Sequence, residues 1–133
     1  MMSKDKVMCA DTGMFLIRVA LGLVFVSHGW SKIQMMDGTV SFFASLGLAT
    51  FVAYLVSWVE LLGGIAMILG VWTKWAGILL AIVMAGAIWY VTGAKGFMGG
   101  GGYEYTLTLL LVSLGVAFAG PGGFTVHKLA GNK

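Results

Sequence analysis

The chain has 133 residues, of which 59% are apolar and only 10% are charged, and its mean hydropathy is +0.97. A soluble domain carries about 25% charged residues, so a water-soluble protein of this size is excluded, because it would expose large apolar patches. The net charge of +3 comes from Lys and Arg residues that are scattered singly. No basic run could follow a phosphate backbone, so we expect no nucleic-acid partner.

Four continuous apolar runs predict four transmembrane helices, at about residues 13–29, 48–70, 75–92 and 103–119. At about 1.5 Å of rise per residue each run measures roughly 25–35 Å, close to the thickness of the hydrocarbon core. The runs are continuous rather than alternating, which favours helices over the strands of a membrane barrel. The sequence therefore predicts an all-α membrane protein, a single domain over residues 1–133 built as a bundle of four transmembrane helices.

Polar and glycine-rich segments separate these runs. Residues 31–47 predict a loop followed by a short interfacial segment that contains Phe42 and Phe43. Residues 71–74 predict a tight hairpin, and residues 93–102 include four consecutive glycines. Gly120-Pro121-Gly122-Gly123 ends the fourth helix, as Gly and Pro do beyond a helix C-terminus. The first run is interrupted by Arg18 and has no small-residue cleavage site after it, so we interpret it as a retained helix and not a signal peptide.

The lysines predict the orientation in the membrane, because cytoplasmic loops are enriched in positive charge. Four spans place both chain ends and the 71–74 hairpin on one side. That side holds five lysines and the other side holds two: Lys4, Lys6, Lys74, Lys128 and Lys133 against Lys32 and Lys95. We therefore expect a multi-pass protein with both termini in the cytoplasm.

The candidate site residues are the ionisable side chains in or beside the apolar runs, because each costs about 2.5–3.5 kcal/mol to insert and is retained for a reason. Arg18, Glu60 and Glu104 lie within the runs, and His28 and Lys32 flank the end of the first. Small residues share their helical faces, which indicates that these side chains point into the bundle.

Their expected depths divide these residues into two groups. Arg18 and Glu60 both fall toward the inner half, so we expect them to pair, either as a structural salt bridge or as a polar site for a ligand head group or a proton. Glu104, Tyr103 and Lys95 fall at the outer side with His28 and Lys32, and predict an outer polar cluster. The alternatives for this cluster are an interfacial carboxylate satisfied by loop amides and an interfacial histidine with one hydrogen bond.

Several kinds of chemistry have no motif in this sequence. A single cysteine, Cys9, allows neither an internal disulfide nor a redox pair. The only two histidines, His28 and His127, fall on opposite sides of the expected topology, so we expect no metal site. The glycine run is not followed by the Gly-Lys-Ser/Thr of a phosphate-binding loop, and no haem, flavin or Ser–His–Asp motif is evident. No residue can be assigned a catalytic role from these patterns.

Four motifs in a fixed order, which together cover about residues 13–123, resemble the DoxX family. They are Arg18 and Gly22 with His28-Gly29-Trp30-Ser31-Lys32; Phe42-Phe43 with Gly47; Glu60-Leu61-Leu62-Gly63-Gly64 with Leu69-Gly70; and Gly101-Gly102-Tyr103-Glu104-Tyr105 with Gly120-Pro121-Gly122. Thr106 departs from the pattern, since relatives often have proline there. The resemblance implies a small four-helix protein of the prokaryotic cytoplasmic membrane. The family is named for a subunit associated with a terminal quinol oxidase and a thiosulfate:quinone oxidoreductase.

Three functions remain open. The resemblance favours a quinone-facing component of a membrane redox system, in which the outer cluster binds the quinone head and a partner protein or bound cofactor carries electrons. The second is a non-catalytic binder or transporter of a small or lipidic molecule. The third is a structural subunit of a larger membrane complex, and a homo-oligomer is compatible with all three.

Overall fold

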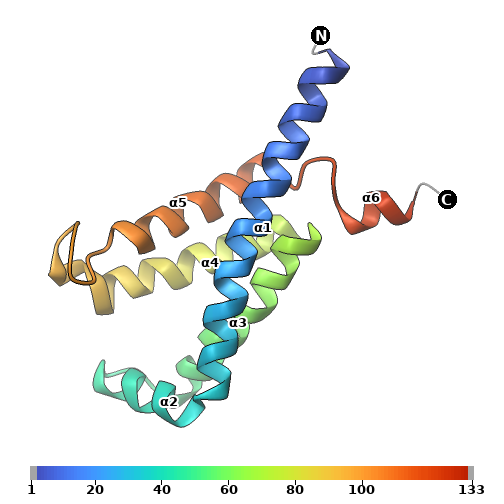
Figure 1. Cartoon of the computed structure of the whole chain (residues 1–133). Coiled ribbons are helices and arrows are strands. Elements are labelled where there is room, and N and C mark those ends of the chain that lie inside the picture. Colours follow the sequence, from blue (N-terminus) through green and yellow to red (C-terminus); the bar gives the residue numbers. More distant parts are fainter. Residues whose placement is uncertain (1–2, 132–133) are drawn as a thin grey trace.

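The computed structural model describes residues 3–131, and its secondary structure there is entirely helical (Figure 1). Lys133, counted above among the inner lysines, lies outside the described residues. The helices are α1 (Lys4–Gln34), α2 (Met36–Ser45), α3 (Thr50–Leu69), α4 (Thr73–Ala87), the π-helical turn η1 (Ile88–Thr92), the 3-10 turn η2 (Gly93–Lys95), α5 (Glu104–Ala119) and α6 (Val126–Ala130).

The expected all-α membrane architecture is confirmed. Within residues 3–131, three helices are long and apolar enough to cross a bilayer: α1, α3 and the continuous helix Thr73–Lys95, which joins α4 to η1 and η2. The fourth apolar helix, α5, is shorter, with 16 residues. The first helix is longer than its apolar run predicts, because polar residues at both ends extend it to 31 residues. The expected interfacial segment around Phe42 is the separate ten-residue helix α2.

The helices form two antiparallel pairs. α1 packs along α3, and α4 packs along α5, while the α3–α4 contact joins the two pairs. In Figure 1 the α4–α5 pair runs at a steep angle to α1. After the end of α1 the chain turns, and α2 lies below the α4–α5 pair. α2 packs against α3, so it stays close to the first pair.

Glycines bring α1 and α3 into close contact and fix which residues face each other. A Cβ atom added to Gly29 would lie 2.9 Å from the carbonyl oxygen of Ser57, and one added to Gly64 would lie 2.8 Å from that of Gly22. Any larger residue would therefore force the two helices apart. This close approach places the end of α1 beside the middle of α3, and the middle of α1 beside the end of α3.

The two pairs share a small apolar core. It consists of Leu21, Phe25, Met67, Ala76, Leu80, Met84, Leu109 and Val116. The buried hydroxyls of Ser57 and Ser113 donate to carbonyl oxygens of their own helices at 2.7 Å, which leaves neither group unsatisfied in an apolar setting. Many large apolar side chains outside this core are exposed, as expected for helices that face lipid.

Candidate functional site

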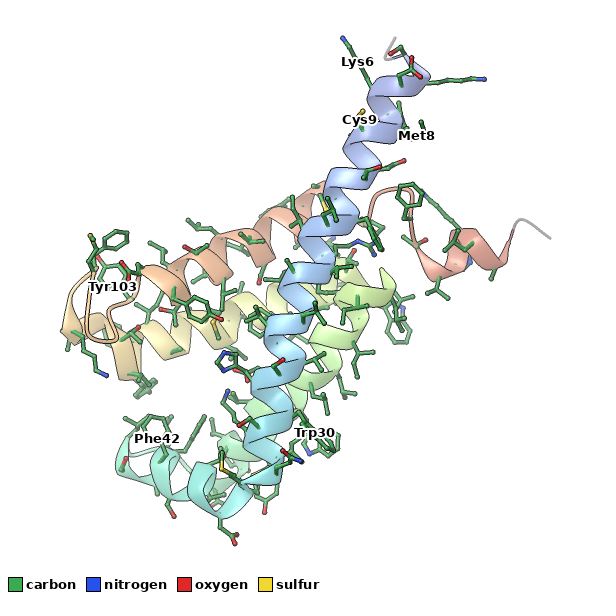
Figure 2. The ribbon with its side chains drawn as sticks, in the orientation of Figure 1. Lys6, Met8, Cys9, Trp30, Phe42 and Tyr103 are labelled. Carbon is green, nitrogen blue, oxygen red and sulfur yellow. The ribbon has the colours of Figure 1, made fainter. Side chains whose placement is uncertain are left out.

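A cavity of about 530 Å³ lies between the two helix pairs and is closed on one side by α2. Its walls are mostly apolar, and Figure 2 shows Phe42 on the face of α2 that is turned toward the α4–α5 pair. The seven polar residues in its wall are His28, Lys32, Glu60, Tyr90, Thr92, Tyr105 and Thr106. Cavities of 300–1,000 Å³ with apolar walls and a few polar groups are typical of small-molecule sites.

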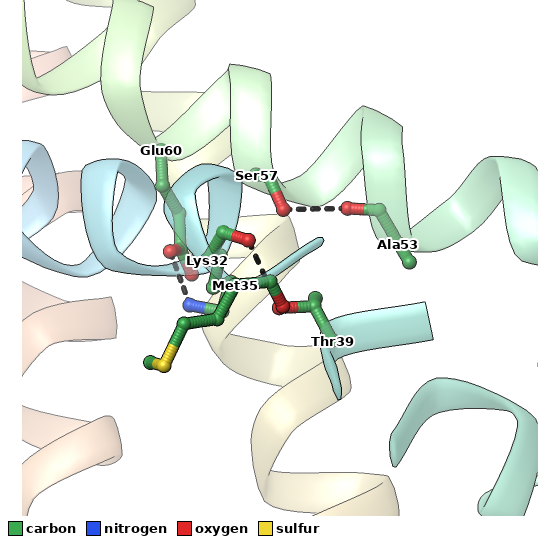
Figure 3. Close-up of polar contacts among 6 residues, drawn as sticks. All are labelled: Lys32, Met35, Thr39, Ala53, Ser57 and Glu60. Atoms are coloured by element: carbon green, nitrogen blue, oxygen red, sulfur yellow. Dashed lines mark hydrogen bonds and ion pairs between the residues drawn. The ribbon is translucent and has the colours of Figure 1, made fainter. Parts of the chain in front are cut away.

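Lys32 and Glu60 form an ion pair in the wall of this cavity (Figure 3). The Glu60 side chain is 3% exposed and the Lys32 side chain is 26% exposed. A carboxylate this deeply buried needs a nearby cation, because a lone buried charge is strongly destabilising. The ammonium group of Lys32 meets that need through Oε2 of Glu60.

The corner between α1 and α2 helps to place Lys32. The hydroxyl of Thr39, in α2, donates to the carbonyl oxygens of Lys32 at 3.0 Å and Met35 at 3.1 Å, as Figure 3 shows for this region. These bonds tie the first turns of α2 to the last turn of α1. One turn earlier in α1, Gly29 lies against Ser57, so the backbone that carries Lys32 is held close to the turn of α3 that carries Glu60.

Two aromatic side chains extend the polar part of the wall. The rings of His28, in α1, and Tyr105, in α5, have centroids 6.3 Å apart with a tilt of 42°.

Two threonines link η1 to α5 in the same wall. The hydroxyls of Thr92, in η1, and Thr106, in α5, lie 3.1 Å apart and form a hydrogen bond. A π-helical turn such as η1 is often found at functional sites, and here it carries Thr92 into the cavity wall.

This arrangement can hold a polar head group beside an apolar body. Lys32 only donates hydrogen bonds and an ionised Glu60 only accepts them, whereas His28 and Tyr105 can do both. Residues 3–131 contain no cluster of three His, Cys, Asp or Glu side chains that could hold a metal ion. The polar groups of the wall can form hydrogen bonds and exchange protons with a polar group placed in the cavity.

The expected pair of Arg18 and Glu60 is wrong. Arg18 is fully buried and donates to the carbonyl oxygens of Met67, at 3.4 Å, and Phe124. It thereby ties the last turn of α3 to the segment that follows α5. The antiparallel contact of α1 and α3 explains the error, because it sets Arg18 beside the end of α3 and leaves Glu60 to Lys32.

The expected outer cluster is brought together only in part. His28 and Lys32 line the cavity, but Glu104 and Tyr103 do not. Glu104 is exposed, and Tyr103 packs edge-to-face on Phe97 with ring centroids 5.3 Å apart. Figure 2 places Tyr103 beside the glycine loop, on the far side of the α4–α5 pair from Trp30.

Sequence reasoning missed Tyr105 as a site residue. It lies one position after Glu104, so it faces a different side of α5. No sequence signal separates it from Tyr103, because its link to the core is Leu109, one helical turn further on, and only the structure shows that Leu109 is a core residue. Tyr105 and Leu109 both line the cavity.

Two known proteins are similar to this chain over most of its length. The chain is 41% identical over 110 residues to a Bacillus subtilis (strain 168) protein named "Putative oxidoreductase CatD". The aligned region covers 83% of this chain and 81% of that protein. It is 27% identical over 128 residues to "Inner membrane protein YqjF" of Escherichia coli (strain K12), and this aligned region covers 92% of the chain and 95% of the relative. No solved structure matches the chain significantly. The DoxX family model matches residues 13–93, and the chain belongs to the DoxX family.

Proposed function

We propose that this protein is a quinone- or quinol-facing component of a membrane redox system and that the cavity is its binding site. The observation that carries the proposal is the Lys32–Glu60 ion pair in the wall of an otherwise apolar cavity between helices. Ionisable residues inside a membrane protein are rare, and they mark ligand, ion or proton sites. The name of the Bacillus subtilis relative, an oxidoreductase, supports the redox setting.

We further propose that four helices cross the cytoplasmic membrane and that both termini are cytoplasmic. The lysine distribution supports this orientation, and the name of the Escherichia coli relative supports the membrane. α5 has 16 residues, or roughly 24 Å of helix, which spans most of a hydrocarbon core of about 30 Å. In this topology Lys32 and the cavity lie toward the outer surface.

The residues of the wall fit a quinone. The Lys32 ammonium and the Tyr105 hydroxyl can donate to carbonyl oxygens of the head group. The apolar side chains of α2, α3 and η1 match an isoprenoid tail, and Phe42, Val52 and Val91 are among them. The cavity volume of about 530 Å³ holds a head group and the first part of such a tail.

The chain's own residues handle protons in this proposal. Oxidation of one quinol to the quinone releases two protons and two electrons. Glu60 and His28 are the wall residues that can accept protons, because a carboxylate and a neutral imidazole are both bases. The two electrons pass to a redox centre of a partner protein, so the proposal includes an oxidoreductase partner.

Binding of a short-tailed quinone to the purified protein in lipid nanodiscs tests the proposal. We expect saturable binding of decylubiquinone and of decylubiquinol. The Glu60→Gln variant should bind the quinol more weakly, and the His28→Ala variant should bind both forms more weakly. Glu104→Gln is the matched control, since it removes an exposed carboxylate outside the cavity wall. Binding that is absent, or unchanged in both cavity variants, contradicts the proposal.

A second candidate, a non-catalytic carrier of a small or lipidic molecule, is favoured by the predominance of apolar side chains in the wall. Native mass spectrometry of the purified protein separates the candidates. A co-purified quinone supports the first function. A co-purified lipid, together with substrate uptake in a separate liposome assay, supports the second. Copurification of a protein partner without either ligand supports a structural subunit.

A further inference from the structure

We propose that the Lys32–Glu60 pair distinguishes the two redox states of the ligand. Lys32 holds the oxidised form by donating to a carbonyl oxygen, and Glu60 holds the reduced form by accepting from a hydroxyl. This inference rests on the proposed function and adds which atoms select between the two forms.

Glu60 presents an unused acceptor. Its Oε2 atom holds the ammonium of Lys32, and its Oε1 atom has no hydrogen bond to any of residues 3–131. In that range Arg18 Nε is the only fully buried side-chain nitrogen or oxygen without a partner, so Oε1 is accessible rather than sealed in the protein. Glu60 lines the cavity, and a ligand there can reach this oxygen.

Lys32 presents unused donors beside it. An ammonium group carries three N–H donors and no acceptor, and Glu60 engages one of them. The Lys32 side chain is 26% exposed and also lines the cavity. The pair therefore offers a ligand one group that only donates and one that only accepts, side by side.

A quinone and its quinol differ in the property that these two groups discriminate. A carbonyl oxygen can only accept a hydrogen bond, so of the two charged groups it can bond to Lys32 alone. A hydroxyl can donate, so it gains a charge-assisted bond to Glu60 that the carbonyl cannot make. The other titratable groups in the wall are His28, Tyr90 and Tyr105, and each can both donate and accept, so they favour neither form.

The pair also favours an uncharged head group. Its two charges already neutralise each other, and an anionic head that took Lys32 would leave the nearly buried Glu60 carboxylate without a partner. Fatty acids and anionic phospholipids are therefore poor ligands for this site, whereas a neutral quinone or quinol keeps the ion pair intact.

The first experiment measures the midpoint potential of decylubiquinone bound to the full chain in nanodiscs, by titration at an electrode at constant pH. The quinone takes up two electrons from the electrode and two protons from the buffer. We expect Glu60→Gln to weaken quinol binding about tenfold or more, because it replaces a charge-assisted hydrogen bond with a neutral one, and to leave quinone binding within about threefold. The bound potential then falls by about 30 mV for each tenfold change.

Adding Lys32→Met to Glu60→Gln provides the opposite test and restores neutrality at the site. We expect the double variant to bind the quinone more weakly than Glu60→Gln does, so that the bound potential rises again. Glu104→Gln is the control and leaves the potential unchanged, since Glu104 lies outside the cavity wall. A Glu60→Gln variant that weakens both forms equally, with no change of potential, overturns the inference.

The second experiment needs no variant. Decylubiquinol is compared with its dimethyl ether, which has the same ring and tail but no hydroxyl donor. We expect the ether to bind the unmodified protein about tenfold more weakly or worse, because the bond to Glu60 is lost. Equal affinity overturns the inference, whereas failure of both redox forms to bind overturns the proposed function itself.

Discussion

Lys32, in the last turn of α1, and Glu60, in the middle of α3, form an ion pair across 28 positions of sequence. Both side chains face the cavity between the helix pairs. Their contact depends on the close approach of α1 and α3, which glycines at positions 22, 29 and 64 permit. One ion pair therefore links the packing of the first helix pair to the polar part of the candidate site.

Removing Lys32 alone is expected to destabilise the protein more than removing both charges. Lys32→Met leaves the Glu60 carboxylate buried without a partner, and we expect a loss of about 3 kcal/mol in the free energy of unfolding. The double variant Lys32→Met/Glu60→Gln should recover most of that loss. Denaturant titration of the detergent-solubilised proteins measures both values. A double variant as unstable as the sum of its single variants would show that the two side chains do not interact.

Arg18 is expected to act independently of Glu60. Arg18→Leu removes the hydrogen bonds to Met67 and Phe124, so the segment after α5 should be released from the end of α3. We expect faster cleavage of residues 120–131 by a protease in limited proteolysis, and no rescue when Glu60→Gln is added. If adding Glu60→Gln did slow the cleavage again, the result would support a contact between Arg18 and Glu60 and contradict the structure.

The sequence predicts where the apolar helices lie, but it does not predict which residues of neighbouring helices face each other. Continuous hydropathy predicts α3 and α5 within a few residues, because each is bounded by Gly or by polar residues. Depth counted from the ends of the apolar runs placed Arg18 beside Glu60. The actual register depends on which backbones meet at Gly29 and Gly64, and spacing along one helix does not contain that information.

The cavity could not be predicted from the sequence, because it also depends on how the helices pack together. It arises from the relative placement of two helix pairs and α2, which no local pattern specifies. His28, Lys32 and Glu60 could be identified because polar groups in apolar runs are conspicuous. Tyr105 could not be preferred over Tyr103, since both lie at the start of the same helix and only the contacts of α5 separate them.

A methyl group at Gly29 is expected to separate α1 from α3 and weaken the ion pair. The added carbon would lie 2.9 Å from the Ser57 carbonyl oxygen, and we expect a loss of about 1–3 kcal/mol in the free energy of unfolding with weaker decylubiquinone binding. Gly13→Ala is the matched control, because nothing lies within 4 Å of its added carbon. Equal stability of the two variants in the same denaturant titration would argue against the close helix contact.

Thr39 is expected to help to position Lys32 through the corner between α1 and α2. Thr39→Val keeps the shape of the side chain and removes the bonds to the Lys32 and Met35 carbonyl oxygens, which should cost about 1 kcal/mol of stability. Ser41→Ala, which removes an exposed bond within α2, is the control. We expect only the Thr39 variant to weaken quinone binding, and an equal effect of both would assign Thr39 a purely local role.

Photoaffinity labelling with a quinone that carries an azide on its head group tests the central claim most directly. After illumination of native membranes and digestion, mass spectrometry identifies the labelled residues. We predict labels on cavity residues of α1, α3 and η1, such as His28, Val56 and Val91, and their loss when unlabelled decylubiquinone competes. Labels confined to the lipid-facing surface, or labelling that competitor does not reduce, would contradict a quinone site between the two helix pairs.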